Sequence, residues 1–390
     1  MLSVDEARAL VLEHARPCAE EAVPLAAAAG RVLAQPVAAL HHVPPFDNSE
    51  MDGFAVQAGP PRRSLGVVGE SRAGAPFEGV VGAGEAVRIS TGAAFPAGAD
   101  GVVPVERTEE PGAAAVTVLD AVTEGQHVRR AGDDVRAGVV TLRPGTRLGP
   151  AEVGVAASGG HASVRCHGRP RVVVLTTGDE LVAPGAPLGQ GQIHEANLLT
   201  LRALTTGDGA ELVRAEHVAD DEAATRAAVG RALTDADLLL ISGGLSVGTH
   251  DHVKPALDDA GVREVFWRVA LRPGKPTWFG THGRTLVLGL PGNPVSTMVT
   301  YLLFGRPAVR VLQGLDPRSR TARAVLTEDV ERLPAREELV RVRLDGDRAT
   351  PTGRQESNRL TSMLGADGLA RIPAGEGRFA AGDAVDVELL

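Results

Sequence analysis

Three short polar loops in this chain of 390 residues have the composition of a phosphate-binding site. They are residues 176–180 (TTGDE), 242–248 (SGGLSVG) and 291–294 (PGNP), and an apolar run of strand length precedes each of them. Glycines let backbone N–H groups approach an anion closely, and a helix N-terminus adds about half a positive charge. The residues that we predict to bind a phosphate-containing substrate are Thr177, Gly178, Ser242, Gly243, Gly244, Ser246, Gly248, Pro291, Gly292, Asn293 and Pro294.

A fourth segment, residues 272–276 (RPGKP), adds two positive charges to this prediction. Its lysine stands out, because 38 of the 40 basic residues are Arg and only Lys254 and Lys275 are Lys. Lysine provides a compact, rotatable ammonium, so a position that keeps Lys is a candidate for chemistry. Chance is the alternative explanation, and Lys254 can be explained as a solvated side chain at a helix start. We assign Arg272 to substrate binding and Lys275 to catalysis.

Three carboxylates, Glu180, Asp220 and Asp251, fall at the ends of predicted strands or in the loops after them. Carboxylate oxygens are the ligands that Mg²⁺ prefers, and Mg²⁺ at this place would neutralise phosphate oxygens. Each acidic residue alone is more often solvated or caps a helix. Three glycine-containing loops at one sheet edge shift the balance toward a phosphate site, against which these carboxylates could hold Mg²⁺.

A serine hydrolase is a competing interpretation, because residues 244–248 (GLSVG) match the G-x-S-x-G nucleophile elbow. That motif needs its serine on the turn that joins a strand directly to a helix. The predicted strand ends near Ile241 and the next helix begins near Val253, so the spacing disfavours a hydrolase.

The loops must be held by the elements of residues 168–313, where strand and helix patterns alternate. Alternating units of this kind predict an α/β fold with a doubly wound parallel sheet, whose strand ends gather the loops into one phosphate-binding rim. The predicted strands are RVVVLTT, AELVRAEHV, DLLLISGG, VREVFWRVA and TLVLGL. The predicted helices are ANLLTLRALTTGDG, DDEAATRAAVGRALTDAD, VKPALDDAG and PVSTMVTYLLFGRPAVRVLQ.

The remaining residues predict three further parts. Helical patterns begin at Val4 and at Leu25, and LGPAEVGVAASGG restores such a pattern later, so residues 1–43 and 139–167 are expected to form one discontinuous helical domain. Residues 44–138 alternate short apolar runs with Gly and Pro, which is typical of an inserted β-rich module. Residues 314–390 also alternate short apolar runs with Gly turns, and this pattern predicts a C-terminal β-barrel.

Composition excludes several classes of protein. The formal charge is −9, which disfavours a nucleic-acid partner, and no apolar run approaches the roughly 20 residues of a membrane span. The N-terminal segment is amphipathic and acidic and not built like a signal peptide, so we expect a cytoplasmic protein without a membrane partner. Cys18 and Cys166 are expected to be ordinary buried or half-buried thiols.

The chain resembles the MoeA family, which shares its fold with the C-terminal part of gephyrin. The resemblance rests on long motifs that follow one another over nearly the whole chain, namely PPFDNSEMDGFAV, RISTGAAFPAGADGVVPVE, RRAGDDVRAGVVTLRPGTRLGPAEVG, TTGDEL, SGGLSVGTHDHVK, LRPGKPTWFG and GLPGNPVS. It implies molybdenum cofactor biosynthesis, in which adenylylated molybdopterin reacts with molybdate and AMP is released. It also implies a four-domain homodimer, in which the discontinuous domain serves as linker and dimerisation domain and the β-rich module faces the active-site sheet of the other subunit.

The same resemblance implies roles for individual residues. Asp52, Thr91 and Asp134 match positions linked to activity, Glu180 and Asp251 match the magnesium-associated carboxylates, and Asp220 matches another acidic position. Arg341 and Ser357 match positions near molybdate, although on short motifs. The family commonly has Lys where Arg272 stands, and frequently Tyr where Phe54 stands; we expect Phe54 to pack and not to react.

Two alternatives use the same fold. One is the molybdopterin adenylyltransferase, which resembles the sheet domain alone and which we otherwise expect as the partner that delivers the substrate. The extra β modules of this chain argue against it. The other is a gephyrin-like scaffold without catalysis, for which the sequence offers no long linker or additional domain.

Overall fold

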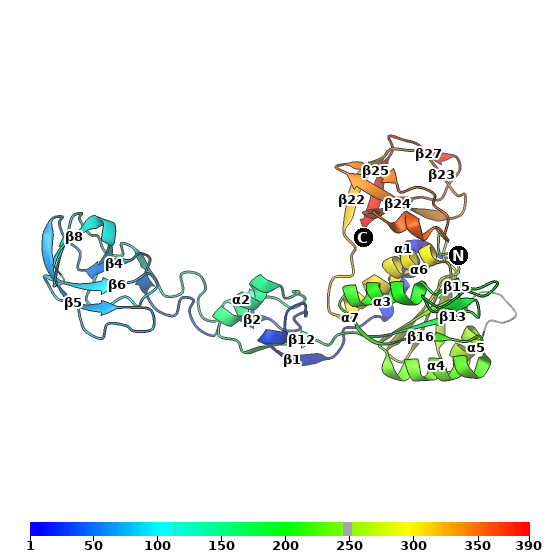
Figure 1. The fold of residues 1–390 in the computed structure, drawn as a ribbon, viewed down its shortest axis with the longest axis horizontal. Coiled ribbons are helices and arrows are strands. Elements are labelled where there is room, and N and C mark those ends of the chain that lie inside the picture. Colours follow the sequence, from blue (N-terminus) through cyan, green and yellow to red (C-terminus); the bar gives the residue numbers. More distant parts are fainter. Residues whose placement is uncertain (113, 245–251) are drawn as a thin grey trace. The chain divides into compact units, whose positions relative to one another are not determined.

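A computed structural model describes residues 1–112, 114–244 and 252–390 (Figure 1). The chain divides into two compact units. The first, named here the sheet-barrel unit, consists of Met1–Glu21, Gly30–Ala34 and Cys166–Leu390, and the second, named the insert unit, of Ala22–Ala29 and Gln35–Arg165. No helix in the described ranges is long and apolar enough to span a membrane.

A six-stranded sheet forms the centre of the sheet-barrel unit, with the strand order β16-β13-β17-β21-β20-β18. Strands β16, β13, β17 and β21 run parallel, as the alternation of strand and helix patterns predicts. The central strands are continuous apolar runs because helices cover both faces of a parallel sheet. The six strands are β13 (Arg171–Thr177), β16 (Glu211–Val218), β17 (Leu238–Ser242), β18 (Arg263–Trp267), β20 (Trp278–His282) and β21 (Thr285–Leu290).

One side of this sheet is antiparallel, which differs from the all-parallel prediction. Strand β20 pairs antiparallel with β21, and β18 pairs antiparallel with β20. A parallel connection requires a crossover, usually a helix, whereas β20 and β21 are joined by a tight hairpin in which Gly283 has φ +57°. The doubly wound arrangement therefore holds for four strands of a mixed sheet.

Helices cover both faces of the sheet (Figure 1). Along β17, Leu238 and Leu240 pack toward the face of α1, α3, α6 and α7, whereas Leu239 and Ile241 pack toward α4 and α5. The helices are α1 (Val4–His14), α3 (Asn197–Gly207), α4 (Glu222–Asp235), α5 (Val253–Asp259), α6 (Pro294–Thr300) and α7 (Arg306–Leu312), with a π-helical segment at Tyr301–Gly305.

Local signals set the starts of three helices. Ser3 and Glu6 form a capping box at α1, Asp221 accepts the N–H of Ala224 at the start of α4, and Pro294 is the first residue of α6. The single long helix predicted from Pro294 onward is continuous but contains the π-helical segment. There a Cβ atom on Gly305 would lie 2.5 Å from the ring of Tyr301, so this turn needs glycine.

The N-terminal region differs from the prediction in two ways. The helix at Val4–His14 does not join residues 139–167, because Val4, Ala7 and Val11 are buried in the core of the α/β sheet. The helical pattern from Leu25 yields only a 3₁₀ turn at Leu25–Ala27, and Gly30 then takes a left-handed φ of +78°. The first helix of the predicted discontinuous helical domain therefore belongs to the sheet-barrel unit.

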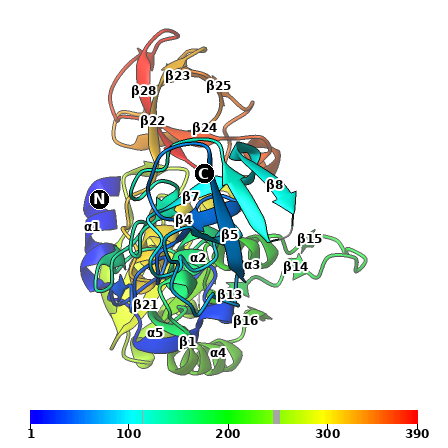
Figure 2. The same cartoon turned by 90° about the vertical axis from the view of Figure 1, so that its left-hand side faces the viewer.

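A closed β-barrel follows the α/β part, as predicted. Its strands pair in the order β24-β25-β22-β28-β26, and β26 pairs again with β24 (Figure 2). Strand β19 (Leu271–Arg272), which ends at the first residue of the RPGKP segment, pairs in parallel with β24 and connects the two parts. The barrel elements are β22 (Thr321–Leu326), β23 (Val330–Glu331), β24 (Glu337–Asp345), β25 (Arg348–Pro351), a 3₁₀ turn (Leu360–Met363), β26 (Gly368–Ile372), β27 (Arg378–Phe379) and β28 (Ala384–Leu389).

The insert unit contains a six-stranded sheet of order β7-β4-β6-β5-β9-β8. Its strands lie within residues 44–138, the range in which the sequence predicts a β-rich module. The elements of this part of the chain are β1 (Glu20–Pro24), β2 (Val37–Ala38), β3 (Asn48–Ser49), β4 (Gly53–Val56), β5 (Arg63–Ser71), β6 (Glu85–Ile89), β7 (Gly101–Pro104), a 3₁₀ turn (Val105–Arg107), β8 (Thr108–Gly112), β9 (Ala115–Val118), β10 (Val128–Arg129), β11 (Val140–Leu142), α2 (Pro150–Ser158) and β12 (Ser163–His167).

The two cysteines are free and shielded, as predicted. Burial, with a smaller contribution from Asp237, raises the pKa of Cys18 to about 12, and burial also raises the pKa of Cys166. Since only the thiolate reacts, we expect both thiols to resist iodoacetamide at pH 8 in the native protein and to react after unfolding. Reactivity of Cys18 should rise only as the pH approaches 12. Rapid modification of the folded protein at pH 8, measured by mass spectrometry, would contradict this expectation.

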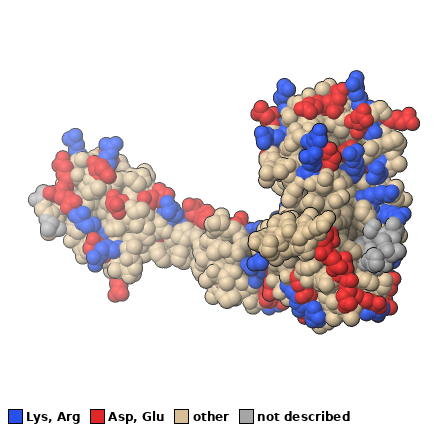
Figure 3. Space-filling model, turned by 45° about the vertical axis from the view of Figure 1, so that its right-hand side comes forward, with Lys and Arg blue, Asp and Glu red and all other residues tan. Residues whose placement is uncertain are grey.

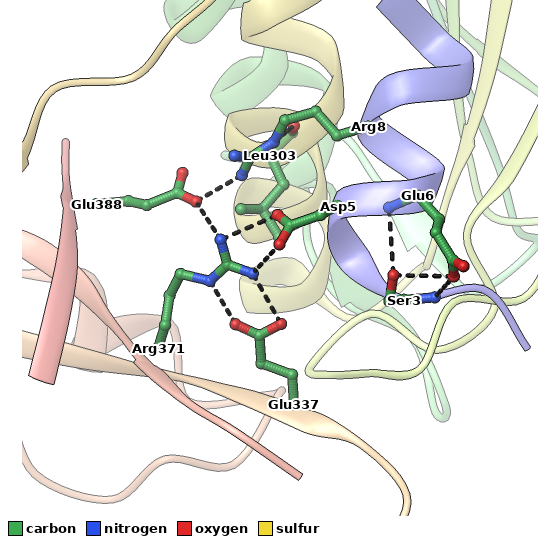
Figure 4. A network of polar contacts seen from close by, with 8 residues as sticks. All are labelled: Ser3, Asp5, Glu6, Arg8, Leu303, Glu337, Arg371 and Glu388. Atoms are coloured by element: carbon green, nitrogen blue, oxygen red, sulfur yellow. Dashed lines mark hydrogen bonds and ion pairs between the residues drawn. The ribbon is translucent and has the colours of Figure 1, made fainter.

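An ion-pair network around Arg371 holds the barrel against α1 (Figure 4). The guanidinium of Arg371 contacts Glu337 at 2.5 Å and Asp5 at 3.0 Å, and it lies 3.7 Å from Glu388, which also pairs with Arg8. Glu337 and Glu388 are only 16% and 7% exposed, so the charge of Glu337 depends on this arginine, and that of Glu388 on Arg8 and Arg371 together.

We expect Arg371→Gln to lower the free energy of unfolding by about 2–4 kcal/mol, because it leaves the half-buried Glu337 carboxylate without its ion pair, whereas Glu388 keeps Arg8. Urea denaturation would measure the effect. The matched control is Arg323→Gln, which removes an exposed pair with Asp386 (62% and 65% exposed) and should change stability little. Equal stability of the two variants would show that the network does not hold the barrel.

Candidate active site

The loops after β13, β17 and β21 meet at the carboxyl edge of the sheet, as predicted. A Cβ atom on Gly243 would lie 2.7 Å from the carbonyl oxygen of Thr177, and one on Gly244 would lie 2.8 Å from its hydroxyl. Both glycines have left-handed backbones, with φ +94° and +65°. A Cβ atom on Gly292 would lie 4.0 Å from the Cα of Gly243, so the third loop reaches the same place. Gly178, with φ +145°, belongs to the first of these loops.

Asn197, which the sequence analysis missed, connects two of the loops. Its amide Nδ2 donates to the hydroxyl of Ser242 over 3.0 Å and to the carbonyl of Gly292 over 2.7 Å. The carbonyl of Pro291 accepts the Thr297 hydroxyl at 2.5 Å. The signal for Asn197 was its place at the start of the first helix after β13, where a side-chain amide can bond to neighbouring loops. The predicted residues Ser246, Gly248 and Asp251 lie outside the described residues.

A cavity of about 400 Å³ opens beside this edge, and we name it the oxyanion cavity. It brings together predicted residues from separate segments, namely Arg272, Lys275, Pro291, Asn293 and Ser357. Four polar residues that the sequence analysis missed also line it: Ser296, Arg336, Gln355 and Glu356. The α/β part and the barrel therefore build this cavity jointly.

Direct contacts tie the two sides of the oxyanion cavity together. The amide of Asn293 donates to the hydroxyl of Ser357 over 2.9 Å, and the backbone N–H of Val295 donates to the Ser357 carbonyl over 3.1 Å. These bonds fix Ser357 next to the N-terminus of α6, where N–H groups and the helix dipole favour an anion.

Arg341 lies behind the wall of the oxyanion cavity and is 0% exposed. Its Nε donates to the Ser362 hydroxyl over 3.2 Å and its Nη1 to the Leu339 carbonyl over 3.4 Å, whereas Nη2 is buried without a partner among the described residues. Burial lowers the pKa of Arg341 to about 10, so the group is charged at neutral pH. A buried charged donor without an acceptor is costly. Arg341 is not among the residues that line the cavity, so it can act on an anion there through its charge and not by direct contact.

Arg272 is held by a buried carboxylate. Its Nε lies 3.6 Å from an oxygen of Glu338, which is 5% exposed. Burial raises the pKa of Glu338, while Arg272, Arg341 and Arg336 act in the opposite direction. This contact gives the guanidinium at position 272 a fixed orientation, which a lysine ammonium would not require.

The two lysines differ in their surroundings. Lys275 is exposed at the cavity, and it makes no side-chain hydrogen bond or ion pair with any residue that the structure describes. Lys254 is not simply solvated, as the sequence allowed: its ammonium lies 3.0 Å from Glu264 and 4.9 Å from the ring centroid of Trp267. Lys254 therefore joins α5 to β18, and Lys275 is free to meet a ligand.

The described part of the predicted carboxylate group lies on two neighbouring loops. Asp179 and Asp220 each accept the backbone N–H of the other, at 3.2 and 3.3 Å, and exposed Glu180 is adjacent. Among the described residues no cluster of three or more His, Cys, Asp or Glu could hold a metal. Carboxylate oxygens beside a phosphate site nevertheless suit Mg²⁺, which usually takes one or two carboxylates plus substrate phosphates.

The insert unit brings two of its predicted residues into contact. An Asp52 carboxylate oxygen accepts the Thr91 backbone N–H at 2.7 Å and the Thr91 hydroxyl at 3.0 Å. Both residues are exposed, as is Asp134, whose backbone N–H donates to Val43. Phe54 is fully buried on β4, so it packs as predicted.

Two larger cavities lie elsewhere in the sheet-barrel unit. One, of about 850 Å³, is at the amino ends of the strands near Arg171 and Asp237, and the other, of about 870 Å³, lies between α1 and the barrel. Neither contains a predicted site residue. On the face drawn in Figure 3, basic and acidic side chains are interspersed. The oxyanion cavity is therefore distinguished by its local groups and not by its size.

Comparisons with known proteins identify the family of the chain. Three family models match successive parts of the chain: the MoeA N-terminal region (domains I and II) at residues 2–160, a probable molybdopterin binding domain at 173–311, and the MoeA C-terminal region (domain IV) at 323–390. Among curated relatives, molybdopterin molybdenumtransferase 2 of Mycobacterium tuberculosis is 38% identical over 99% of both chains. The molybdopterin molybdenumtransferase of Haemophilus influenzae is 39% identical over 80% of this chain and 78% of its own.

Solved structures give the same result. The molybdopterin biosynthesis MoeA protein of Pyrococcus horikoshii superposes with a TM-score of 0.87 at 29% identity, covering 100% of this chain and 99% of its own. Fold and site thus define an enzyme of molybdenum cofactor biosynthesis. The chain belongs to the MoeA family, and its curated relatives are molybdopterin molybdenumtransferases.

Proposed function

We propose that this protein transfers molybdenum from molybdate to adenylylated molybdopterin and releases AMP. The observation that supports this most is the oxyanion cavity, where Arg272, Lys275 and Ser357 converge directly beside the glycine-rich loops. The reaction needs two neighbouring anion sites, one for the phosphates and one for molybdate. The loops around Gly243 and the oxyanion cavity supply donors of the right kind for each.

The bond changes of the reaction define what the residues must do. Two Mo–S bonds form between molybdate and the enedithiol sulfurs, one Mo–O bond breaks, and that oxygen leaves as water with the two thiol protons. A water oxygen attacks phosphorus in the phosphoanhydride, which yields AMP and the phosphate of molybdopterin. Fixed cations stabilise negative charge on both groups. We assign molybdate to Arg272, Lys275 and Ser357, which line the oxyanion cavity, with the buried Arg341 adding its charge from behind the wall, and the phosphates to the loop glycines.

The carboxylates Glu180 and Asp251 would hold Mg²⁺ at the phosphate side, and Asp220 would support the loop of Glu180 through its bonds with Asp179. When bound, Mg²⁺ neutralises charge on the phosphate oxygens. The chain itself would place these carboxylates next to the backbone N–H groups of the glycine-rich loops, so that Mg²⁺ and the loops bind the same phosphate groups. This proposal is supported by the donor chemistry of the two described loops.

A homodimer would complete the site. Exposed apolar side chains of the insert unit support an association surface, since Leu40 is 63%, Phe46 47%, Val139 49% and Val140 50% exposed. We propose that the insert unit, with Asp52, Thr91 and Asp134, faces the oxyanion cavity of the partner subunit. The adenylyltransferase that makes the substrate is the natural further partner, because its product is the substrate of the proposed reaction.

The deciding experiment incubates the purified protein with adenylylated molybdopterin and follows AMP release with and without molybdate. Molybdate-dependent release is expected. No such release by a folded protein would end the transferase proposal. A parallel incubation with molybdopterin, ATP and Mg²⁺ tests the alternative, and adenylylated product there would make the chain an adenylyltransferase. Turnover in either assay also excludes a scaffold without catalysis.

A further inference from the structure

We propose that Arg336, in the turn before β24, binds the oxyanion substrate together with Arg272 and Lys275. The inference rests on the proposed function, since it takes the oxyanion cavity to be the molybdate site. No motif of the sequence pointed to Arg336, which stands in an unremarkable stretch between two short strands.

The fold places Arg336 at the cavity with a defined backbone. A β-bridge between Leu333 and Arg336 closes the turn that leads into β24, and the Arg336 side chain lines the cavity on the barrel side. Lys275 lines it on the α/β side. An anion between the two parts of the unit would therefore be approached by cations from both.

The three arginines near the oxyanion cavity differ in how freely they can bind. Arg341 is buried and bonded to Ser362 and Leu339, and Arg272 lies beside Glu338. Arg336 is half-buried, and its guanidinium makes no hydrogen bond or ion pair with the described residues. Arg336 can thus bind a ligand without giving up a hydrogen bond or an ion pair, although its charge also acts on the Glu338 carboxylate. Its planar guanidinium suits two oxygens of one oxyanion.

The charges at the cavity favour a dianion. Arg272, Lys275 and Arg336 line it with three positive charges, whereas Glu356 is the single acidic residue in the lining and lies 3.7 Å from Arg359. Behind the wall, Glu338 is matched by Arg341 as well as by Arg272. The lining cations therefore exceed the carboxylates, and a tetrahedral dianion such as molybdate would balance them.

The test is a calorimetric titration of molybdate into wild type, Arg336→Gln and the control Arg323→Gln, which removes the same charge from the barrel far from the cavity lining. We expect Arg336→Gln to weaken molybdate binding roughly 10- to 100-fold, the range of one charge-assisted hydrogen bond. Arg323→Gln should bind as wild type does. The thermal unfolding midpoint of Arg336→Gln should equal that of wild type, because no contact within the described structure is lost.

A second titration uses AMP, because a phosphate offers similar oxygens. Weakened AMP binding with unchanged molybdate binding would assign Arg336 to the phosphate side and overturn the inference. Unchanged binding of molybdate by Arg336→Gln, with a wild type that binds it, would overturn the inference alone. A wild type that binds no molybdate would overturn the proposed function as well.

Discussion

Lys275→Arg is expected to lower molybdate-dependent AMP release at least about tenfold, and Lys275→Gln roughly 100-fold, because Lys275 is a lining cation without another partner among the described residues. The arginine variant keeps the positive charge but replaces a compact ammonium by a larger, planar guanidinium. The cavity lining already contains the guanidinium groups of Arg272 and Arg336. The fold should not change, since the side chain is exposed and makes no contact within the described structure that stabilises it. Steady-state rates and the thermal unfolding midpoint measure the two effects separately.

The other lysine provides the matched control. Lys254→Gln removes the ion pair with Glu264 and the contact with Trp267, so it should reduce stability while AMP release stays near the wild-type rate. If Lys275→Arg releases AMP as fast as wild type, the lysine at that position is incidental. Equal losses of rate in the Lys254 and Lys275 variants would indicate a general effect on the fold.

A mixed dimer of Asp52→Asn and Lys275→Gln subunits is expected to recover about half of the wild-type activity, although each homodimer should be almost inactive. If each site takes Asp52 from one subunit and Lys275 from the other, one site carries both lesions and the second carries none. Asp52→Asn keeps the oxygen that accepts from Thr91, so the variant removes charge and not the local structure. Differently tagged subunits and two-step purification give the mixed dimer for the AMP assay.

The matched control places both lesions on one subunit and pairs it with a wild-type subunit. A shared site then leaves each site with one lesion and predicts almost no activity. A site confined to one subunit predicts the opposite pattern, with half activity in this control and none in the first dimer. The two arrangements therefore separate the models without any assumption about absolute rates.

The α/β part was predictable because its signals are local and repeated. Apolar runs such as that of β17, the capping aspartate Asp221 and the proline at Pro294 each act within a few residues, and the loops between them collect at one edge by topology alone. For the same reason Thr177, Gly243 and Gly292 could be placed near one another before the structure was known.

Other features depend on contacts between distant segments. The antiparallel pairing of β20 follows from a hairpin whose sequence does not differ from that of other glycine turns. Helix α1 packs on the sheet core through an amphipathic pattern that would equally suit packing on another domain. Arg336 and Gln355 reach the oxyanion cavity only because β19 pairs with β24, a contact of two residues without any sequence signal. The placement of such residues is decided by tertiary packing and not by propensity.

The closed strand order of the barrel also has a consequence for synthesis of the chain. Strand β28 pairs with both β22 and β26, so the ring cannot close until β28 has been made. Because domains fold as units while the chain emerges, the sheet can form earlier, on the ribosome. The cations of β24 and its preceding turn reach their final places only when the ring closes. Nascent chains should therefore pass through a stage in which the sheet is folded and the substrate cavity is still open on one side.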